Sequence, residues 1–182
     1  LTFTATGLTS VTSASFIVAA GPPTNIAANS AIAQTANAGT AVAAAPSVLV
    51  TDAFGNPVAG VNVTFAVTAG GGVITPTTVA TNALGIATVT SWTLGAVAGA
   101  NSVTATVAGL SGSPVAFNAV GQVGPAAAIV ATSATTQSAP FSSAVTAPPA
   151  VQVRDLFGNG VSGVSVTFTV TAGAGVTTPA SP

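Results

Sequence analysis

The sequence predicts an all-β protein of tandem β-sandwich domains, with about seven strands in each repeat of ~103 residues. Three observations support this class. A block of sequence recurs at a fixed offset, apolar residues alternate with a period of two, and Gly, Asn and Pro interrupt the alternating runs at short intervals. No run approaches the ~18 uninterrupted apolar residues of a membrane-spanning helix.

The repeat is visible without gaps. Residues 51–73 and 154–176 share 16 identities in 23 aligned positions, at an offset of 103 residues. The same offset aligns the Gly-Pro pair at Gly21 with the pair at Gly124. Chance does not produce such agreement over this length, so the chain contains copies of one structural unit.

We divide the chain into three parts on this basis. Residues 1–20 are the C-terminal part of a preceding repeat, 21–123 a complete repeat, and 124–182 the N-terminal part of a following repeat. In the first part, Thr4-Ala5-Thr6 matches Thr104-Ala105-Thr106, and Phe16 then falls near the place of Phe117. The short Gly-Pro joins predict that neighbouring domains lie close together in a row.

The alternation defines a core face, because side chains of a strand point to opposite faces in turn. In each copy, Val and Phe occupy one face of the longest predicted strand, while Thr, Ser, Asn and Ala occupy the other. We therefore predict core positions at Val61, Val63, Phe65, Val67, Val164, Val166, Phe168 and Val170, together with Trp92 at the edge of the core. Six further strands are expected near residues 25–32, 48–50, 77–81, 85–92, 102–107 and 115–119.

The turn before the longest strand has the same residues in both copies. Gly and Asn suit backbone conformations with positive φ, and an Asp just before them can cap backbone N–H groups two residues on. The predicted structural residues of these turns are Asp52, Gly55, Asn56, Gly60, Asp155, Gly158, Asn159 and Gly163.

These residues carry a resemblance to a known family. The run from Val50 to Val61, followed by Val63-Thr64-Phe65, resembles the group 1 bacterial immunoglobulin-like domain of the invasin and intimin type. Gly85-Ile86-Ala87, Trp92 and Asn101-Ser102-Val103 fit the second half of that domain in order. The resemblance implies an immunoglobulin-like sandwich, used in tandem to extend surface proteins away from a bacterial cell. One departure is that the charge is unusually low for this family.

Composition excludes several classes of function. The charged side chains are Asp52, Arg154 and Asp155, which make 2% of the chain against about 25% in an average protein. Nucleic-acid binding requires several cationic side chains, and zinc, haem or iron–sulfur sites require His or Cys, of which there are none. No cofactor, nucleic acid or direct membrane insertion of this segment is expected.

The composition leaves a metal site and a catalytic site to be considered. Asp52 and Asp155 are weak calcium candidates, because calcium prefers several carboxylates and each copy offers one; turn capping is the preferred interpretation. Catalysis is not expected, since neither His nor Lys is present to activate a hydroxyl nucleophile.

Three functions follow, in order of preference. The first is a structural, extracellular spacer or stalk in a bacterial surface adhesin or secreted repeat protein, whose partners are neighbouring repeats of the same chain. The second is a subunit of a homopolymeric fibre, sheath or surface layer, suggested by the scarcity of charges that normally protect sheet edges. A carbohydrate-binding module is a distant third, because aromatic residues make only 5% of the chain.

Overall fold

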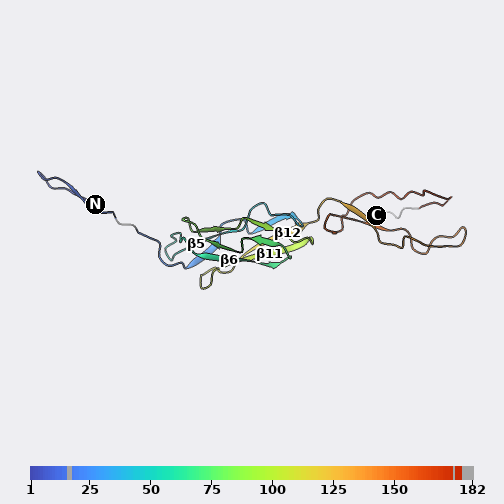
Figure 1. Cartoon of the computed structure of the whole chain (residues 1–182), viewed down its shortest axis with the longest axis horizontal. Helices are drawn as coiled ribbons and strands as arrows, with labels where there is room; N and C mark the ends of the chain where they lie inside the picture. Colours follow the sequence, from blue (N-terminus) through green and yellow to red (C-terminus); the bar gives the residue numbers. More distant parts are fainter. Residues whose placement is uncertain (16–17, 174, 178–182) are drawn as a thin grey trace.

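The computed structural model describes residues 1–15, 18–173 and 175–177. This part of the chain consists of strands, turns and loops, and it contains no helix of the length and apolar character needed to cross a membrane. A short N-terminal ribbon, a central sandwich and a C-terminal part follow one another along the long axis (Figure 1).

One layer of the sandwich is a five-stranded sheet. Its order is β4-β12-β11-β6-β8, in which β4 and β12 run parallel and the other neighbours antiparallel. The strands are β4 (Ala33–Asn37), β6 (Asn62–Ala69), β8 (Thr78–Ala80), β11 (Gly99–Thr106) and β12 (Val115–Gln122).

The other layer contains the remaining strands of the central part. Its antiparallel three-stranded sheet has the order β3-β5-β9, and β7 pairs with β10 beside it. The strands are β3 (Asn25–Ala28), β5 (Ser47–Thr51), β7 (Val73–Thr75), β9 (Ile86–Thr88) and β10 (Ser91–Thr93). The two layers together form an all-β, immunoglobulin-like sandwich.

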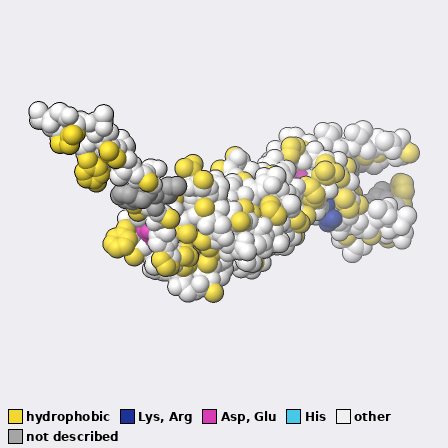
Figure 2. All heavy atoms as spheres, turned by 60° about the vertical axis from the view of Figure 1, so that its left-hand side comes forward, with side chains coloured by type: hydrophobic (Ala, Val, Ile, Leu, Met, Phe, Trp, Pro, Cys, Tyr) yellow, Lys and Arg dark blue, Asp and Glu magenta, His cyan; other side chains and the backbone are white. Residues whose placement is uncertain are grey.

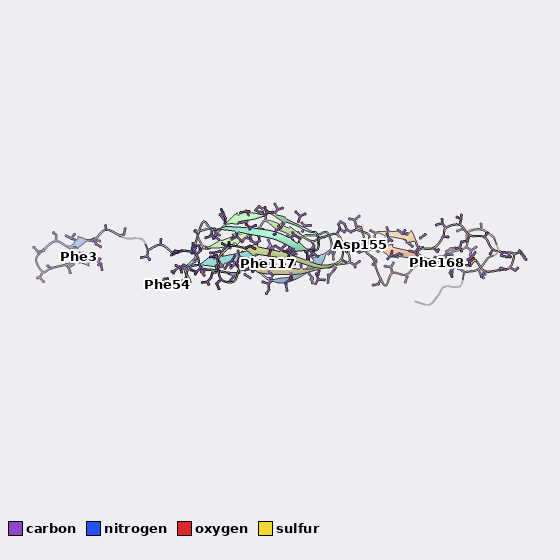
Figure 3. All side chains as sticks on the ribbon, turned by 90° about the horizontal axis from the view of Figure 1, so that it is seen from below. Phe3, Phe54, Phe117, Asp155 and Phe168 are labelled. Atoms are coloured by element: carbon purple, nitrogen blue, oxygen red, sulfur yellow. The ribbon has the colours of Figure 1, made fainter. Side chains whose placement is uncertain are left out.

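The core lies between the layers and follows the period-two pattern. In β6, Val63 and Phe65 are buried while Thr64 and Ala66 are exposed. Trp92 is fully buried rather than at the core edge, and its Nε1 has no hydrogen-bond partner among the described residues. Figure 3 shows Phe117 inside the sandwich. Further core side chains are those of Val48, Val50, Leu94, Val103 and Ala105.

Two predicted core residues are only half-buried. Val61 and Val67 pack against the core cluster from its rim, because they lie at the two ends of the alternating run. The buried part of the run is therefore shorter than the alternation suggests.

The strand count also differs from the expected seven, because ten strands lie within residues 21–123. The predicted strand over 85–92 is divided into β9 and β10 at Val89 and Thr90, and the additional strands are β4 and β7. β4 arises because the chain crosses from one sheet to the other after β3, where Ser30 Oγ accepts a hydrogen bond from the Ser47 N–H at 3.0 Å.

The N-terminal ribbon is a hairpin of β1 (Thr2–Phe3) and β2 (Val11–Thr12). Its turn contains Gly7 at φ 82° and a hydrogen bond from Leu8 N–H to Ala5 O. The turn between β11 and β12 is similar, with Gly109 at φ 79° and a bond from the Leu110 N–H. Phe16 lies outside the described residues, and the division into three domains remains a proposal.

The C-terminal part repeats the first strand pair of the sandwich. β13 (Ala128–Ala131) and β14 (Val151–Arg154) are antiparallel, with the same register as β3 and β5 at an offset of 103 residues. Gln137 also bonds to both the N–H and the C=O of Ala147, as Gln34 does to Ala44. The hydrogen-bonding pattern of the first copy is thus reproduced in this segment.

The predicted core strand of this part differs in the structure. Residues 161–173 form no strand, Val166 is half-buried, and Val164, Phe168 and Val170 are 43%, 39% and 40% exposed. Burial of an alternating face requires a second layer of sheet opposite it. No such layer faces these residues in the described part of the chain, so their side chains stay open to solvent.

Candidate functional site: the aspartate turns and the contact between repeats

Each copy has an aspartate turn, which we define as residues 52–56 in the first copy and 155–159 in the second. Asp52 Oδ1 accepts hydrogen bonds from the backbone N–H groups of Phe54 and Asn56, both at 2.9 Å. Asp52 is 2% exposed, so these bonds satisfy a nearly buried carboxylate. A short acidic side chain just after a strand favours this turn, because it can reach backbone N–H groups two to four residues ahead.

The second oxygen of the carboxylate ties the turn to the linker. Asp52 Oδ2 accepts from the Gly21 N–H at 2.8 Å and from Asn56 Nδ2 at 2.9 Å. In the second copy, Asp155 Oδ2 accepts from the Gly124 N–H at 3.0 Å and from Asn159 Nδ2 at 2.9 Å. The Gly that begins each proposed repeat is therefore held by the aspartate 31 residues later.

Hydrogen bonding stabilises the charged form of both aspartates. The Asn56 side chain and then the Gly21 N–H lower the pKa of Asp52 from 3.8 to about 2, against the opposing effect of burial. Burial is the largest single influence on Asp155 and raises its pKa. The Asn159 side chain and the N–H groups of Gly124, Asn159 and Phe157 together outweigh burial and lower that pKa to about 2.

The glycines and asparagines of the turns have different roles from each other. Gly55, Gly60, Gly158 and Gly163 all have positive φ, between 74° and 89°. Asn56 and Asn159 do not, because Ser142 is the one non-Gly residue with positive φ in the described ranges. The prediction of a positive φ at Asn is wrong, since these asparagines act through their side-chain amides instead.

A neutral version of the same turn occurs elsewhere in the sandwich. Asn82 Oδ1 accepts from the N–H groups of Leu84 and Ile86 at 2.9 and 3.1 Å, as Asp52 Oδ1 does from its own turn. Asn82 has no linker partner among the described residues. A side-chain amide is thus sufficient for the local turn, and the second carboxylate oxygen serves the link to Gly21 or Gly124.

Asn159 joins the C-terminal part to the sandwich. Its Nδ2 donates to Ala96 O at 2.8 Å, and its Oδ1 accepts from the Ala98 N–H at 3.0 Å. The same Nδ2 also donates to Asp155, so one amide connects the carboxylate, the turn and the preceding sandwich. This pair of bonds has the pattern of a short strand pairing, and it fixes both position and orientation.

Phe157 completes the contact by packing on Gly39. A Cβ at Gly39 would overlap the Phe157 ring. The φ of 72° also favours glycine, although Ser142, at the corresponding position of the second copy, has φ 61°. The ring of Phe157 supplies a second, steric reason for glycine at position 39.

The surface that receives Phe157 and Asn159 consists of Gly39 and residues 95–99, which we call the docking face. Asn101, which is 2% exposed, holds this loop by accepting from the Gly95 N–H at 2.9 Å and donating to Gly99 O at 3.1 Å. Gly39 N–H donates to Gly95 O at 2.9 Å and connects the two segments of the face. The docking face is thus held in place by the sandwich that carries it.

Sequence reasoning identified the aspartate turns but missed the docking face. Nothing in the alternation marks Gly39 or the run Ala96-Val97-Ala98, and Asn101 stood out only through the family resemblance. Two signals were available: Gly39 differs from the corresponding Ser142 of the second copy, and a polar Asn101 occupies a core-facing position of β11.

The remaining candidates have simple positions. Asp52 and Asp155, the weak calcium candidates, each accept hydrogen bonds from four N–H groups, an arrangement that suits an anion and not a cation. The described part of the chain contains no group of three or more acidic, His or Cys side chains that could hold a metal ion. Arg154 donates from Nε to Gln152 Oε1 at 2.9 Å. Because Trp92 is fully buried, its ring is not available as a surface platform for a sugar.

Comparison with known families gives a match over the central part of the chain. A family model described as the bacterial Ig-like domain (group 1) matches residues 24–120, which include the first aspartate turn, Asn101 and all of the docking face. No curated protein matches the chain.

Several solved structures are similar. They include a C-terminal 282-residue fragment of intimin in complex with the intimin-binding domain of the translocated intimin receptor, at 25% identity and TM-score 0.41, over 55% of this chain and 33% of that one. The Escherichia coli adhesin FdeC matches at 16% identity and TM-score 0.49, over 76% and 42%. A D00-D0 fragment of intimin matches at 24% and 0.40, over 55% and 46%. The chain thus spans less than half of each of these three structures.

Proposed function

The chain belongs to the bacterial Ig-like domain family (group 1), and from this we propose that it is a spacer in a bacterial surface adhesin or secreted repeat protein. Its work is mechanical: each sandwich folds as a unit, and the joints between units set the reach and direction of the array. The proposed location is outside the cell, and the proposed partners are neighbouring repeats.

The observation that carries this proposal is the double attachment of the linker after β12. On its N-terminal side, Gln122 O accepts from the Ala38 N–H at 2.8 Å. On its C-terminal side, the Gly124 N–H donates to Asp155, while Asn159 of the same turn is bonded to Ala96 and Ala98. A linker held at both ends limits bending, which is what a spacer requires and a freely jointed chain lacks.

We propose that this joint rests on hydrogen bonds and packing among its own residues. The carboxylate is held by N–H groups, and Asn159 and Phe157 are uncharged. We accordingly propose no catalytic role: the two aspartates lie in separate turns, and each already accepts four hydrogen bonds.

A second candidate, a subunit of a fibre, sheath or surface layer, is favoured by the scarcity of charge. The edge strands β4 and β8 of the five-stranded sheet carry no charged side chain, although exposed edges usually bear such residues to prevent association. Charged side chains form only small patches on the visible face (Figure 2). Exposed apolar residues such as Ile32 and Val120 lie on or beside the β4–β12 pair.

Electron microscopy of the native material separates the two candidates. Single thin rods attached to cells, without lateral order, support the spacer. Regular fibres or lattices with a repeat near one or two domain lengths support the polymer subunit. Sedimentation of the purified full chain over a wide concentration range provides the matched solution test, because a spacer stays monomeric and a polymer subunit associates.

A further inference from the structure

The two aspartate turns have the same sequence at Phe-Gly-Asn but different surroundings. Phe157 packs on Gly39 and is 47% exposed, whereas Phe54 is 89% exposed. Asn159 bonds to Ala96 and Ala98, whereas Asn56 Oδ1 accepts no hydrogen bond from any described residue. The first turn therefore presents the groups that the second turn uses, with no partner on them.

Those groups are already held in the docking-competent arrangement. Asn56 Nδ2 donates to Asp52 Oδ2 at 2.9 Å, and Asn159 Nδ2 donates to Asp155 Oδ2 at the same distance. Gly21 is tied to Asp52 as Gly124 is tied to Asp155. Because the local hydrogen bonds agree one for one, the amide of Asn56 points from its turn as the amide of Asn159 does.

The turn and the docking face lie at opposite ends of the sandwich. Figure 3 places Phe54 at the end nearest the N-terminal ribbon, while Asp155, whose turn contacts the docking face, lies at the other end. Two different complementary surfaces at opposite ends of one unit form a head-to-tail contact, which can be repeated without limit. This geometry suits successive units of one row.

We propose that the Phe54–Asn56 turn is a docking surface for a second copy of this repeat, placed directly before Gly21. Asn56 takes the two hydrogen bonds offered by residues equivalent to Ala96 and Ala98 of that copy, and Phe54 packs on its equivalent of Gly39. This inference rests on the proposed spacer function and specifies the joint through which repeats are connected.

The contact of Asn159 and Phe157 with the docking face identifies the occupant. The docking face requires one amide that both donates and accepts, and an aromatic ring over a glycine; Asn56 and Phe54 supply both. Neither surface carries a charged side chain other than the internally bonded aspartate, so the contact depends on shape and on paired amides. In the described part of the chain, residues 1–15 make no hydrogen bond to this turn.

The test uses the full chain with an extra copy of residues 21–123 inserted directly before Gly21. The new junction, Gln122-Val123-Gly21-Pro22, reproduces the natural Gln122-Val123-Gly124-Pro125. Segmental isotope labelling of the first copy lets NMR report hydrogen exchange at its own Ala98 amide. The proposal expects this amide to exchange as slowly as Ala98 of the unmodified chain.

Asn56→Ala in the second copy should then accelerate exchange at Ala98 of the first copy about fivefold, which corresponds to the loss of one hydrogen bond. The matched control is Asn56→Ala in the first copy, which makes the same local change but should leave that Ala98 unaffected. Phe54→Ala in the second copy gives an independent variant that leaves the Asn56 and Asp52 side chains intact, and it should also accelerate exchange. Fast exchange in the parent two-copy chain, or no response to either second-copy variant, overturns the proposal.

Small-angle X-ray scattering of the same sample tests the spacer function separately, because it measures whether the particle is extended. An extended particle with an unprotected Ala98 contradicts the docking surface and leaves the spacer intact. A protected Ala98 in a folded-back particle supports the docking surface and contradicts the spacer.

Discussion

The Gly124 N–H donates a hydrogen bond to Asp155 Oδ2 at 3.0 Å, which ties the linker to the turn that contacts the preceding sandwich. Asn159 of the same turn bonds to both the carboxylate and the Ala96 carbonyl. A continuous chain of hydrogen bonds thus runs from the linker through Asp155 and Asn159 to the docking face.

Asp155→Asn should release the linker and keep the turn. Asn82 forms the same local turn with an amide oxygen, so the N–H bonds of Phe157 and Asn159 should persist. An amide nitrogen in place of Oδ2 cannot accept from Gly124. Hydrogen exchange should therefore accelerate at Gly124 and stay near its original rate at Phe157. Equal acceleration at both amides contradicts this division of roles.

The stability of the protein should depend on pH only in acid. Both aspartates have a folded-state pKa of about 2, below the value of about 3.9 expected when unfolded. The stability they confer is complete above about pH 4 and is lost as the pH falls from about 4 towards 2. Because the sequence has no His and no other acidic side chain, the melting temperature should be constant from about pH 5 to 8.

The matched control for the pH profile is the double variant Asp52→Asn, Asp155→Asn. It should have a lower melting temperature at neutral pH and should lack the acid-dependent loss, as measured by calorimetry. A similar acid loss in this variant would show that other groups cause it.

Asn101→Ala should destabilise the sandwich and loosen the docking face. The substitution leaves the Gly95 N–H and the Gly99 carbonyl without their buried partner, which costs about 1–3 kcal/mol. Denaturant unfolding measures the cost, and faster exchange at Gly95 measures the loosening. Asn118→Ala, on an exposed position of β12, is the control and should change stability by less than about 0.5 kcal/mol. Equal costs for the two variants argue against this role of Asn101.

Gly39→Ala should disrupt the joint because the new Cβ overlaps the Phe157 ring. Its effect contains a backbone contribution from the positive φ as well, and a double-mutant cycle with Phe157→Ala separates the two. The cost of Gly39→Ala in the free energy of unfolding should be smaller when Phe157 is already Ala. An unchanged cost means that the ring does not constrain position 39.

The alternation of Val and Phe was sufficient to predict the sandwich and much of its core, because a period of two permits one buried face. Val63 and Phe65 follow it closely. The short strands were less predictable: β7 and β10 have three residues each, and they form by pairing with each other although they are separated in the sequence. Local sequence carries little information about such pairings.

The aspartate turn was predictable because all its partners except Gly21 lie within four residues of Asp52. The docking face was not, because Asn159 meets Ala96 and Ala98 across more than sixty residues of sequence. Its contacts use backbone groups, which every residue has, so no side-chain pattern marks them. In the sequence, Phe157 has no feature that distinguishes it from other turn residues. Its contact with Gly39 is visible only in the structure.

The orientation of the C-terminal part relative to the sandwich is the most direct test of an ordered joint. The chain contains no cysteine, so Thr64→Cys and Thr132→Cys, both at exposed positions, provide unique sites for two spin labels. Pulsed electron resonance should give one narrow distance distribution in the otherwise unmodified chain and a broad one after Asn159→Ala. A broad distribution before that substitution would contradict a joint held by Asp155 and Asn159, and with it the proposal that this chain is an ordered spacer.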